Sequence, residues 1–203
     1  MIKVENVHVY NVVPAVYSAR NALNSWDKSD SDLATGTLGS ADLKLAMSLV
    51  TAGSDHSKFM RMIGISMDIT APIYWWKEYD TYKVGTVANS CSTMHKIHEK
   101  EFTLEDFSYD HLNEKSLYML NDTIKYLNAV REAFLDTKDK DYWWQMIQLL
   151  PSSYNQRRTV TLNYAVARNM YHARKNHKLD CWITFCKQLE TLPYAKELIC
   201  SVG

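Results

Sequence analysis

Apolar residues recur every three or four positions in the second half of this 203-residue chain. This spacing gathers them on one face of an α-helix, so it predicts a long amphipathic helix that begins near Asn113. The residues on this face are Leu117, Leu120, Ile124, Leu127, Val130 and Phe134. Further helices are predicted over residues 141–149, where Pro151 ends the segment, and over residues 159–175 and 179–192. The C-terminal half is therefore predicted to be rich in helix.

The N-terminal half mixes strand and helix signals. Residues 2–10 and the second half of residues 59–69 alternate apolar and polar side chains, which predicts two strands. A short helix is expected over residues 15–23, and a second one is expected to run to Val50 with Ser40 as its N-cap. Pro72 suits the first turn of another helix. Strands followed by a helical half predict an α+β fold in a single domain over residues 1–203.

Two polar segments are predicted to be irregular. Residues 26–39 are punctuated by glycine and read as a loop. Residues 83–93 are small and polar, and their backbone amides could approach a ligand. Amides together with Thr86, Asn89, Ser90 and Ser92 would suit a phosphate, although the segment is not a Walker motif.

Charge and composition exclude several classes of protein. The formal net charge is zero, which gives no general attraction toward nucleic acid or an anionic membrane. No apolar stretch reaches the roughly 18 to 20 residues that span a bilayer, and the N-terminus lacks the apolar core of a signal peptide. The four cysteines contain no CxxC pair, which favours free thiols in a cytoplasmic protein over a disulfide framework or a metal site.

Three further groups could carry function, and each also has a structural interpretation. His56 follows a glycine turn, where a lone histidine is more often a surface or hydrogen-bonded residue than a ligand contact. The run from Trp75 to Lys83 is rich in aromatic residues, which usually fill a core or an interface but could stack on a planar ring. The predicted helix 159–175 carries Asn163, Arg168, Asn169, His172 and Arg174; its basic end is either a solvated helix terminus or a cluster that holds a phosphate.

The order of these segments resembles the flavin-dependent thymidylate synthases. The run from Ala15 to Arg20 is similar to the family's early Ala-Ala-Arg helix, and the helix from Ser40 precedes a turn with a histidine, as in the family. The resemblance covers about residues 15 to 182. The residues that carry it further are Ala52 to His56, Ile69 to Ile73, Leu150 and Pro151, Thr161 to Asn163, Asn169 and Arg174.

The family's signature, Arg-His-Arg followed by a polar run with Ser, Asn-Glu, Ser and Arg, is degenerate here. It falls on Thr81-Tyr82-Lys83 or, one residue later, on Tyr82-Lys83-Val84. The following run keeps Asn89, Ser90 and Ser92 but has neither the Glu nor the closing Arg. Ala165 also stands where the family has an arginine. Lys83 could replace one guanidinium only as a point charge.

The resemblance implies a small mixed sheet, a homotetramer with FAD, and dUMP stacked on the flavin. It implies reductive methylation of dUMP, with methylenetetrahydrofolate as carbon donor and NADPH as reductant. His56, Lys83, Asn163 and Asn169 would contact the cofactor. Arg174 would be the catalytic residue, because a fixed guanidinium favours charge that develops on the uracil ring. The substrate contacts would be Glu78, Asn89, Ser90, Ser92 and Arg174.

Two alternatives remain open from the sequence. A catalytically inactive relative could keep the fold and bind a flavin, a nucleotide or a partner, since a fold persists through changes of function. A helical interaction protein could also resemble the family by chance.

Overall fold

The computed structural model describes residues 2–201. These residues form two compact units. Within the described residues, unit 1 consists of residues 2–3, 69–81 and 89–158, and unit 2 of residues 4–68, 82–88 and 159–201. The division does not test whether residues 1–203 form a single domain, which stays a prediction.

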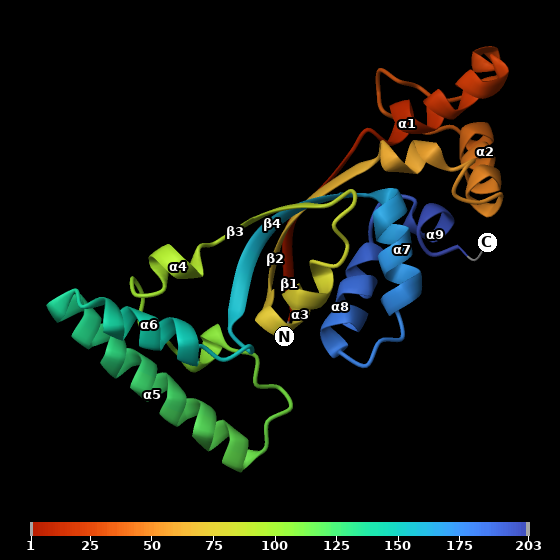
Figure 1. Cartoon of the computed structure of the whole chain (residues 1–203). Coiled ribbons are helices and arrows are strands. Elements are labelled where there is room, and N and C mark those ends of the chain that lie inside the picture. Colours follow the sequence, from red (N-terminus) through yellow and green to blue (C-terminus); the bar gives the residue numbers. More distant parts are fainter. Residues whose placement is uncertain (1, 202–203) are drawn as a thin grey trace. The chain divides into compact units, whose positions relative to one another are not determined.

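Four strands form one sheet: β1 (Lys3–Tyr10), β2 (Gly64–Pro72), β4 (Asn155–Asn163) and β3 (Val87–Ser90), in the order β1-β2-β4-β3 (Figure 1). Asp68 of β2 accepts hydrogen bonds from the side chains of Asn6 on β1 and Thr159 on β4, which links the three strands. Neighbouring strands run antiparallel, rather than in the mixed arrangement expected. The α+β fold class with a helix-rich C-terminal half is confirmed.

β4 was not predicted. The helix expected from Thr159 begins only at Tyr164, because Thr159, Val160 and Thr161 are β-branched and belong to the sheet. Val160 and Leu162 are buried and alternate with less buried neighbours, which is the period of a strand. The expectation of an irregular segment over residues 83–93 was also wrong in part, since Val87–Ser90 pairs with β4.

The helices of unit 2 are short. These are α1 (Val12–Ser18), η1 (Ala19–Leu23), η2 (Trp26–Lys28), α2 (Ser40–Thr51), η3 (Lys58–Arg61), α7 (Tyr164–Arg174), α8 (Asp180–Leu189) and α9 (Ala195–Leu198). Ile65 and Met67 of β2 are fully buried, and so is Ile63 just before the strand, as their alternation predicts. Trp182 and Phe185 of α8 are equally buried and stack edge to face, which makes α8 part of the core.

The N-terminus of α2 is capped by a residue from the preceding loop. Ser40 is the first helical residue and not the N-cap, and the cap residue Gly39 has no side chain to offer. Asp30 replaces it by accepting from the backbone N–H groups of Ala41 (2.8 Å) and Asp42 (3.0 Å). The free N–H groups of a helix start need such acceptors, so the loop before α2 is fastened to the helix.

A buried ion pair fastens the same region. Arg20 of η1 lies 2.5 Å from Asp42, and both side chains are almost fully buried. The second carboxylate oxygen of Asp42 accepts from the hydroxyls of Ser29 and Ser31. Since these contacts come from η1 and from the loop that precedes α2, the pair ties both segments to the helix.

Unit 1 contains α3 (Ile73–Tyr79), α4 (Thr93–Lys96), η4 (Leu104–Asp106), α5 (Glu114–Thr137) and α6 (Lys140–Leu149). Asn113 caps α5 by accepting from Ser116, and α5 and α6 pack side by side (Figure 1). The long amphipathic helix is thereby confirmed. Its buried face consists of Leu120, Ile124, Leu127 and Val130.

The aromatic residues of α3 are buried. Trp75, Trp76 and Tyr79 are at most 1% exposed, and their rings lie about 5 Å apart. The guanidinium of Arg158 stacks over Trp76 at 4.3 Å and pairs with Asp80. Of the two interpretations of this aromatic run, the structural one therefore holds for these three residues.

Candidate functional site

The α7 helix of unit 2 carries three of the predicted site residues, one near each end and one between. Asn163 is its N-cap, and its side-chain oxygen accepts from the N–H of Val166 at 3.0 Å. Asn169 lies in the middle of the helix, and Arg174 is the last helical residue. The three residues are thus spread over the whole length of the helix.

Arg174 is held in place by its own unit. Its Nε donates to the hydroxyl of Tyr82 at 2.9 Å, and its Nη1 lies 2.9 Å from Nε2 of His177. The guanidinium carbon lies 4.9 Å from the ring centroid of Trp182, within the range of a cation–π contact. These contacts orient the planar group and keep its charge half-buried.

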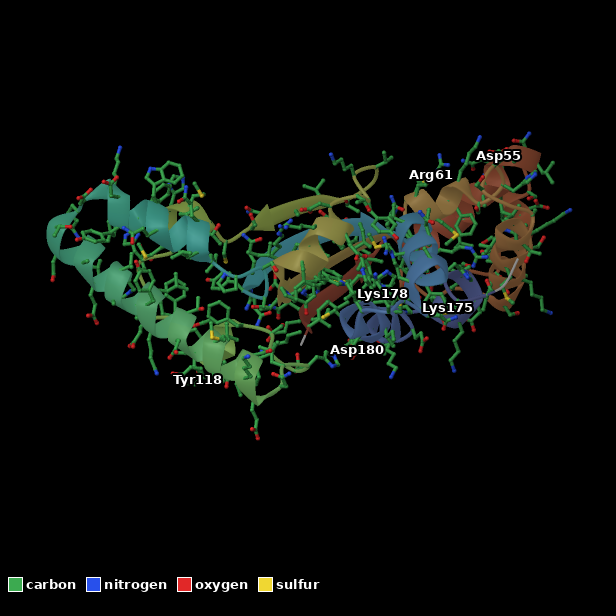
Figure 2. The ribbon with its side chains drawn as sticks, turned by 60° about the horizontal axis from the view of Figure 1, so that its bottom comes forward. Asp55, Arg61, Tyr118, Lys175, Lys178 and Asp180 are labelled. Atoms are coloured by element: carbon green, nitrogen blue, oxygen red, sulfur yellow. The ribbon has the colours of Figure 1, made fainter. Side chains whose placement is uncertain are left out.

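The basic end of α7 extends beyond Arg174. Lys175 and Lys178 follow it, and Figure 2 shows them with Asp180 at the connection between α7 and α8. Nδ1 of His177 accepts from the N–H of Leu179, so this connection also orients the imidazole that faces Arg174. Positive charge at a helix C-terminus is favoured by the macrodipole, and it also leaves this end suited to an anion.

The segment from Tyr82 to Thr86 lies alongside α7. Tyr82 contacts Arg174 at one end, and Gly85 meets Asn163 at the other. Gly85 has φ +81°, and a Cβ there would lie 3.0 Å from both Asn163 Nδ2 and Val166 Cγ2. The close approach and the positive φ together explain why glycine stands here. Lys83 lies on this segment, exposed and with no ion pair among the described residues.

A cavity of about 390 Å³ lies beside the middle of α7. Asn169 lines it together with Arg168 and His172 of the same helix, and Gly53, Ser54 and Ser57 come from the turn after α2. Arg168 donates to the carbonyls of Leu198 and Ile199, which fixes one wall. Desolvation, followed by the charges of Arg168 and Lys175, lowers the pKa of His172 below its ordinary value.

His56 lies on the other side of the same turn. It is exposed and lines a second cavity of about 360 Å³ with residues of α1, η1 and η3, among them Asn21 and Phe59. The structure therefore places His56 and Asn169 on two different cavities of unit 2. The turn that carries His56 does contribute Gly53, Ser54 and Ser57 to the cavity of Asn169.

The other predicted substrate contacts belong to unit 1. Glu78 is half-buried on α3, and Asn89 and Ser90 are exposed on β3. Ser92 caps α4 by accepting from His95, and it lines a cavity of about 200 Å³ that also contains Cys91, Lys96 and Arg157. Within residues 2–201, no three His, Cys, Asp or Glu side chains gather as a metal site.

Three residues that fix Arg174 were not singled out for this role from the sequence. Tyr82 and His177 are brought to the guanidinium only by the packing of the 82–86 segment and of the α7–α8 connection. Trp182 reads as an ordinary core residue in the α8 pattern. The degenerate signature was the available signal for Tyr82, since Tyr82 occupies it in both registers.

Searches by sequence find no protein-family profile and no curated protein that matches the chain. Solved structures do match. Thymidylate synthase X from Helicobacter pylori, solved with FAD and dUMP, superposes with a TM-score of 0.73 at 17% identity, covering 98% of this chain and 97% of that one. A second structure of the flavin-dependent enzyme from Helicobacter pylori, also with FAD and dUMP, gives a TM-score of 0.72 at 16% identity, with 98% and 100% covered.

A third similar structure is the UMP/dUMP methylase PolB from Streptomyces cacaoi bound with 5-Br dUMP. Its TM-score is 0.68 at 14% identity, covering 97% of this chain and 91% of that one. All three identities are low, and the likeness extends over nearly the whole of each chain. The chain therefore has the fold of the flavin-dependent thymidylate synthases.

Proposed function

We propose that this protein is an enzyme that binds a flavin and modifies a pyrimidine nucleotide at C5, most specifically by reductive methylation of dUMP. The observation that carries the proposal is the fixed guanidinium of Arg174 at the end of α7, in a fold shared with proteins solved with FAD and dUMP. A preorganised cation beside a nucleotide base stabilises negative charge that develops on the ring.

The residues of unit 2 are compatible with a flavin. The cavity of about 390 Å³ is large enough for part of such a cofactor, and its amide and hydroxyl groups can hydrogen-bond ring and ribityl oxygens. Asn169 would hold the cofactor there, with Asn163, Lys83 and His56 as further contacts. FAD would supply the hydride, with NADPH as its reductant and methylenetetrahydrofolate as the carbon donor.

The remaining roles are catalysis and nucleotide binding. Arg174 would lie on the uracil ring and stabilise the charge that forms when C5 becomes nucleophilic, and Tyr82 and Trp182 would keep it oriented. Glu78, Asn89, Ser90 and Ser92 would bind the nucleotide, with hydroxyl and amide groups toward its phosphate. We further propose a homotetramer that functions in the cytoplasm, as expected from the resemblance. Among the described residues, no helix is long and apolar enough to cross a bilayer.

The visible spectrum of the purified protein, alone and after addition of FAD, tests the flavin. A colourless protein that takes up no FAD would remove the basis of the proposal. Tritium release from [5-³H]dUMP with methylenetetrahydrofolate, NADPH and FAD tests the reaction, because C5 must lose its hydrogen as methylation proceeds. We expect release by the wild type, its loss in Arg174→Gln, and unchanged release in the control Arg61→Gln, whose side chain is exposed on η3.

A second function is favoured by one observation. In either register, Thr81-Tyr82-Lys83 or Tyr82-Lys83-Val84, the signature has lost its paired arginines, and Tyr82 is hydrogen-bonded to Arg174. These features would suffice for a catalytically inactive relative that only binds a flavin or a nucleotide. Such a protein would take up FAD and bind dUMP in calorimetry but release no tritium under any combination of the cosubstrates.

A further inference from the structure

Unit 1 contains an aromatic cavity of about 410 Å³ that no residue of the proposed function lines. Its walls come from α4, α5 and α6 and the segment after α4. This volume lies within the range of about 300 to 1,000 Å³ that is typical of small-molecule sites. The lining residues are Met94, His95, His98, Phe134, Lys140, Trp143 and Trp144.

The aromatic walls are held in fixed orientations. Trp143 donates from Nε1 to the carbonyl of Met94 at 3.0 Å, which ties α6 to α4. Trp144 stands at 71° to Trp143, with centroids 4.8 Å apart, and remains 48% exposed. His98 meets Phe134 edge to face at 4.9 Å. Rigid rings at different angles favour a flat aromatic guest over a flexible aliphatic one, because an aromatic guest can make both offset-stacked and edge-to-face contacts with them.

The charge of the lining has one sign. Lys140, His95 and His98 are basic, and no carboxylate lines the cavity. Neither Lys140 nor the ring of His95 has a hydrogen bond or an ion pair among residues 2–201. Two acids next to these residues in the sequence have partners of their own: Glu99 pairs with Lys96, and Asp139 caps α6.

His98 is half-buried, so part of its ring lines the cavity while another part is covered by the protein. Its Nδ1 is shielded from solvent and has no hydrogen-bond partner in the described part of the chain. A guest in the cavity would therefore meet the exposed part of the ring and not Nδ1.

We propose that this cavity binds a planar aromatic carboxylate. The aromatic part lies against Trp143, Trp144 and Phe134, and the carboxylate is directed to Lys140 and the two histidines. A neutral aromatic compound would forgo the ionic contact, and an aliphatic acid would forgo the ring contacts. The site lies wholly within unit 1 and does not depend on the flavin or nucleotide proposal.

Calorimetric titration with 2-naphthoate tests the site, with tryptophan emission as the second signal. We expect binding that Trp144→Ala weakens about tenfold and Lys140→Gln about fivefold. Trp144 and Lys140 are exposed, so both variants should fold, which circular dichroism checks. The matched controls are Trp26→Ala and Lys115→Gln, since both residues are exposed and neither lines the cavity; these variants should bind like the wild type.

The choice of guest is tested by two relatives of the probe. 2-Naphthamide keeps the rings without the charge, and cyclohexanecarboxylate keeps the charge without the aromatic ring; both should bind at least fivefold more weakly. The proposal is overturned if 2-naphthoate does not bind at millimolar concentration, or if it binds Trp144→Ala and Lys140→Gln as it binds the wild type. It is equally overturned if Trp144→Ala leaves 2-naphthoate binding intact and instead lowers the oligomeric state, because the face would then be a contact between copies of the chain.

Discussion

Nε of Arg174 donates a hydrogen bond to the hydroxyl of Tyr82 across 2.9 Å, and 92 positions of sequence separate the two residues. This bond joins the last residue of α7 to the segment where the signature of the similar family falls. The same hydroxyl explains how a tyrosine can stand there: it accepts from the arginine instead of supplying a second positive charge. The orientation of Arg174 is therefore a property of the packing of unit 2.

Tyr82→Phe should loosen Arg174 without removing the ring that packs beside it. One lost hydrogen bond is worth about 1 kcal/mol, or roughly a fivefold change in an equilibrium constant. We expect dUMP binding, measured by calorimetry, to weaken by about this factor. Tyr118→Phe is the control, because Tyr118 is 64% exposed on α5 of unit 1 (Figure 2). Equal dUMP affinity in wild type and Tyr82→Phe would show that the bond does not position the arginine.

Gly85→Ala should be more harmful than Gly36→Ala. Both glycines have a positive φ, +81° and +72°, so both substitutions carry a similar backbone cost. Only at Gly85 would the new methyl group meet other atoms, 3.0 Å from Asn163 and Val166. We expect an additional loss of about 1 kcal/mol in the free energy of unfolding, measured in urea. Equal losses in the two variants would argue against tight contact between the 82–86 segment and α7.

Asp42→Asn should strongly destabilise unit 2. Asp42 is fully buried, and the substitution would leave Arg20 as a buried cation without its counter-charge. Removal of one partner from a buried pair costs about 3 to 5 kcal/mol. Asp122→Asn breaks the exposed pair with Lys125 and should change the free energy of unfolding by less than about 0.5 kcal/mol. Urea denaturation of both variants measures the contrast, and similar small losses would contradict a structural role for the buried pair.

Asp30→Ala should give a stability difference that depends on pH. Hydrogen bonds, first from the N–H of Ala41 and also from that of Asp42, lower the pKa of Asp30 below its ordinary value of 3.8. A lowered carboxylate pKa stabilises the fold above the unfolded-state pKa, and this contribution is lost as the pH falls through the folded-state pKa. The variant should therefore unfold at lower urea than the wild type at pH 6, and the gap should shrink below about pH 4.

The control for this series is Asp27→Ala, since Asp27 lies in the neighbouring η2 and caps no helix. Its urea midpoint should follow that of the wild type at both pH values. A constant gap between wild type and Asp30→Ala from pH 6 to pH 3 would show that the charge of Asp30 does not contribute to the start of α2.

Local patterns succeeded where one element buries one face. The alternation of Ile63, Ile65 and Met67 identified β2, and the helical spacing after Asn113 identified α5. Prediction failed where contacts with distant residues determine the local structure. Residues 87–90 form a strand only because β4 lies beside them. The start of α2 is capped by Asp30 and not by Ser40, which lies ten positions later in the chain.

The order of residues along the chain was enough to predict the α+β class and the helical second half, because hydrophobic period is a local property. Tertiary packing was needed to bring Arg174 to Tyr82, His177 and Trp182, and to place His56 and Asn169 on different cavities. Such contacts depend on where distant segments come to lie when apolar faces are buried together, and no local pattern records that arrangement.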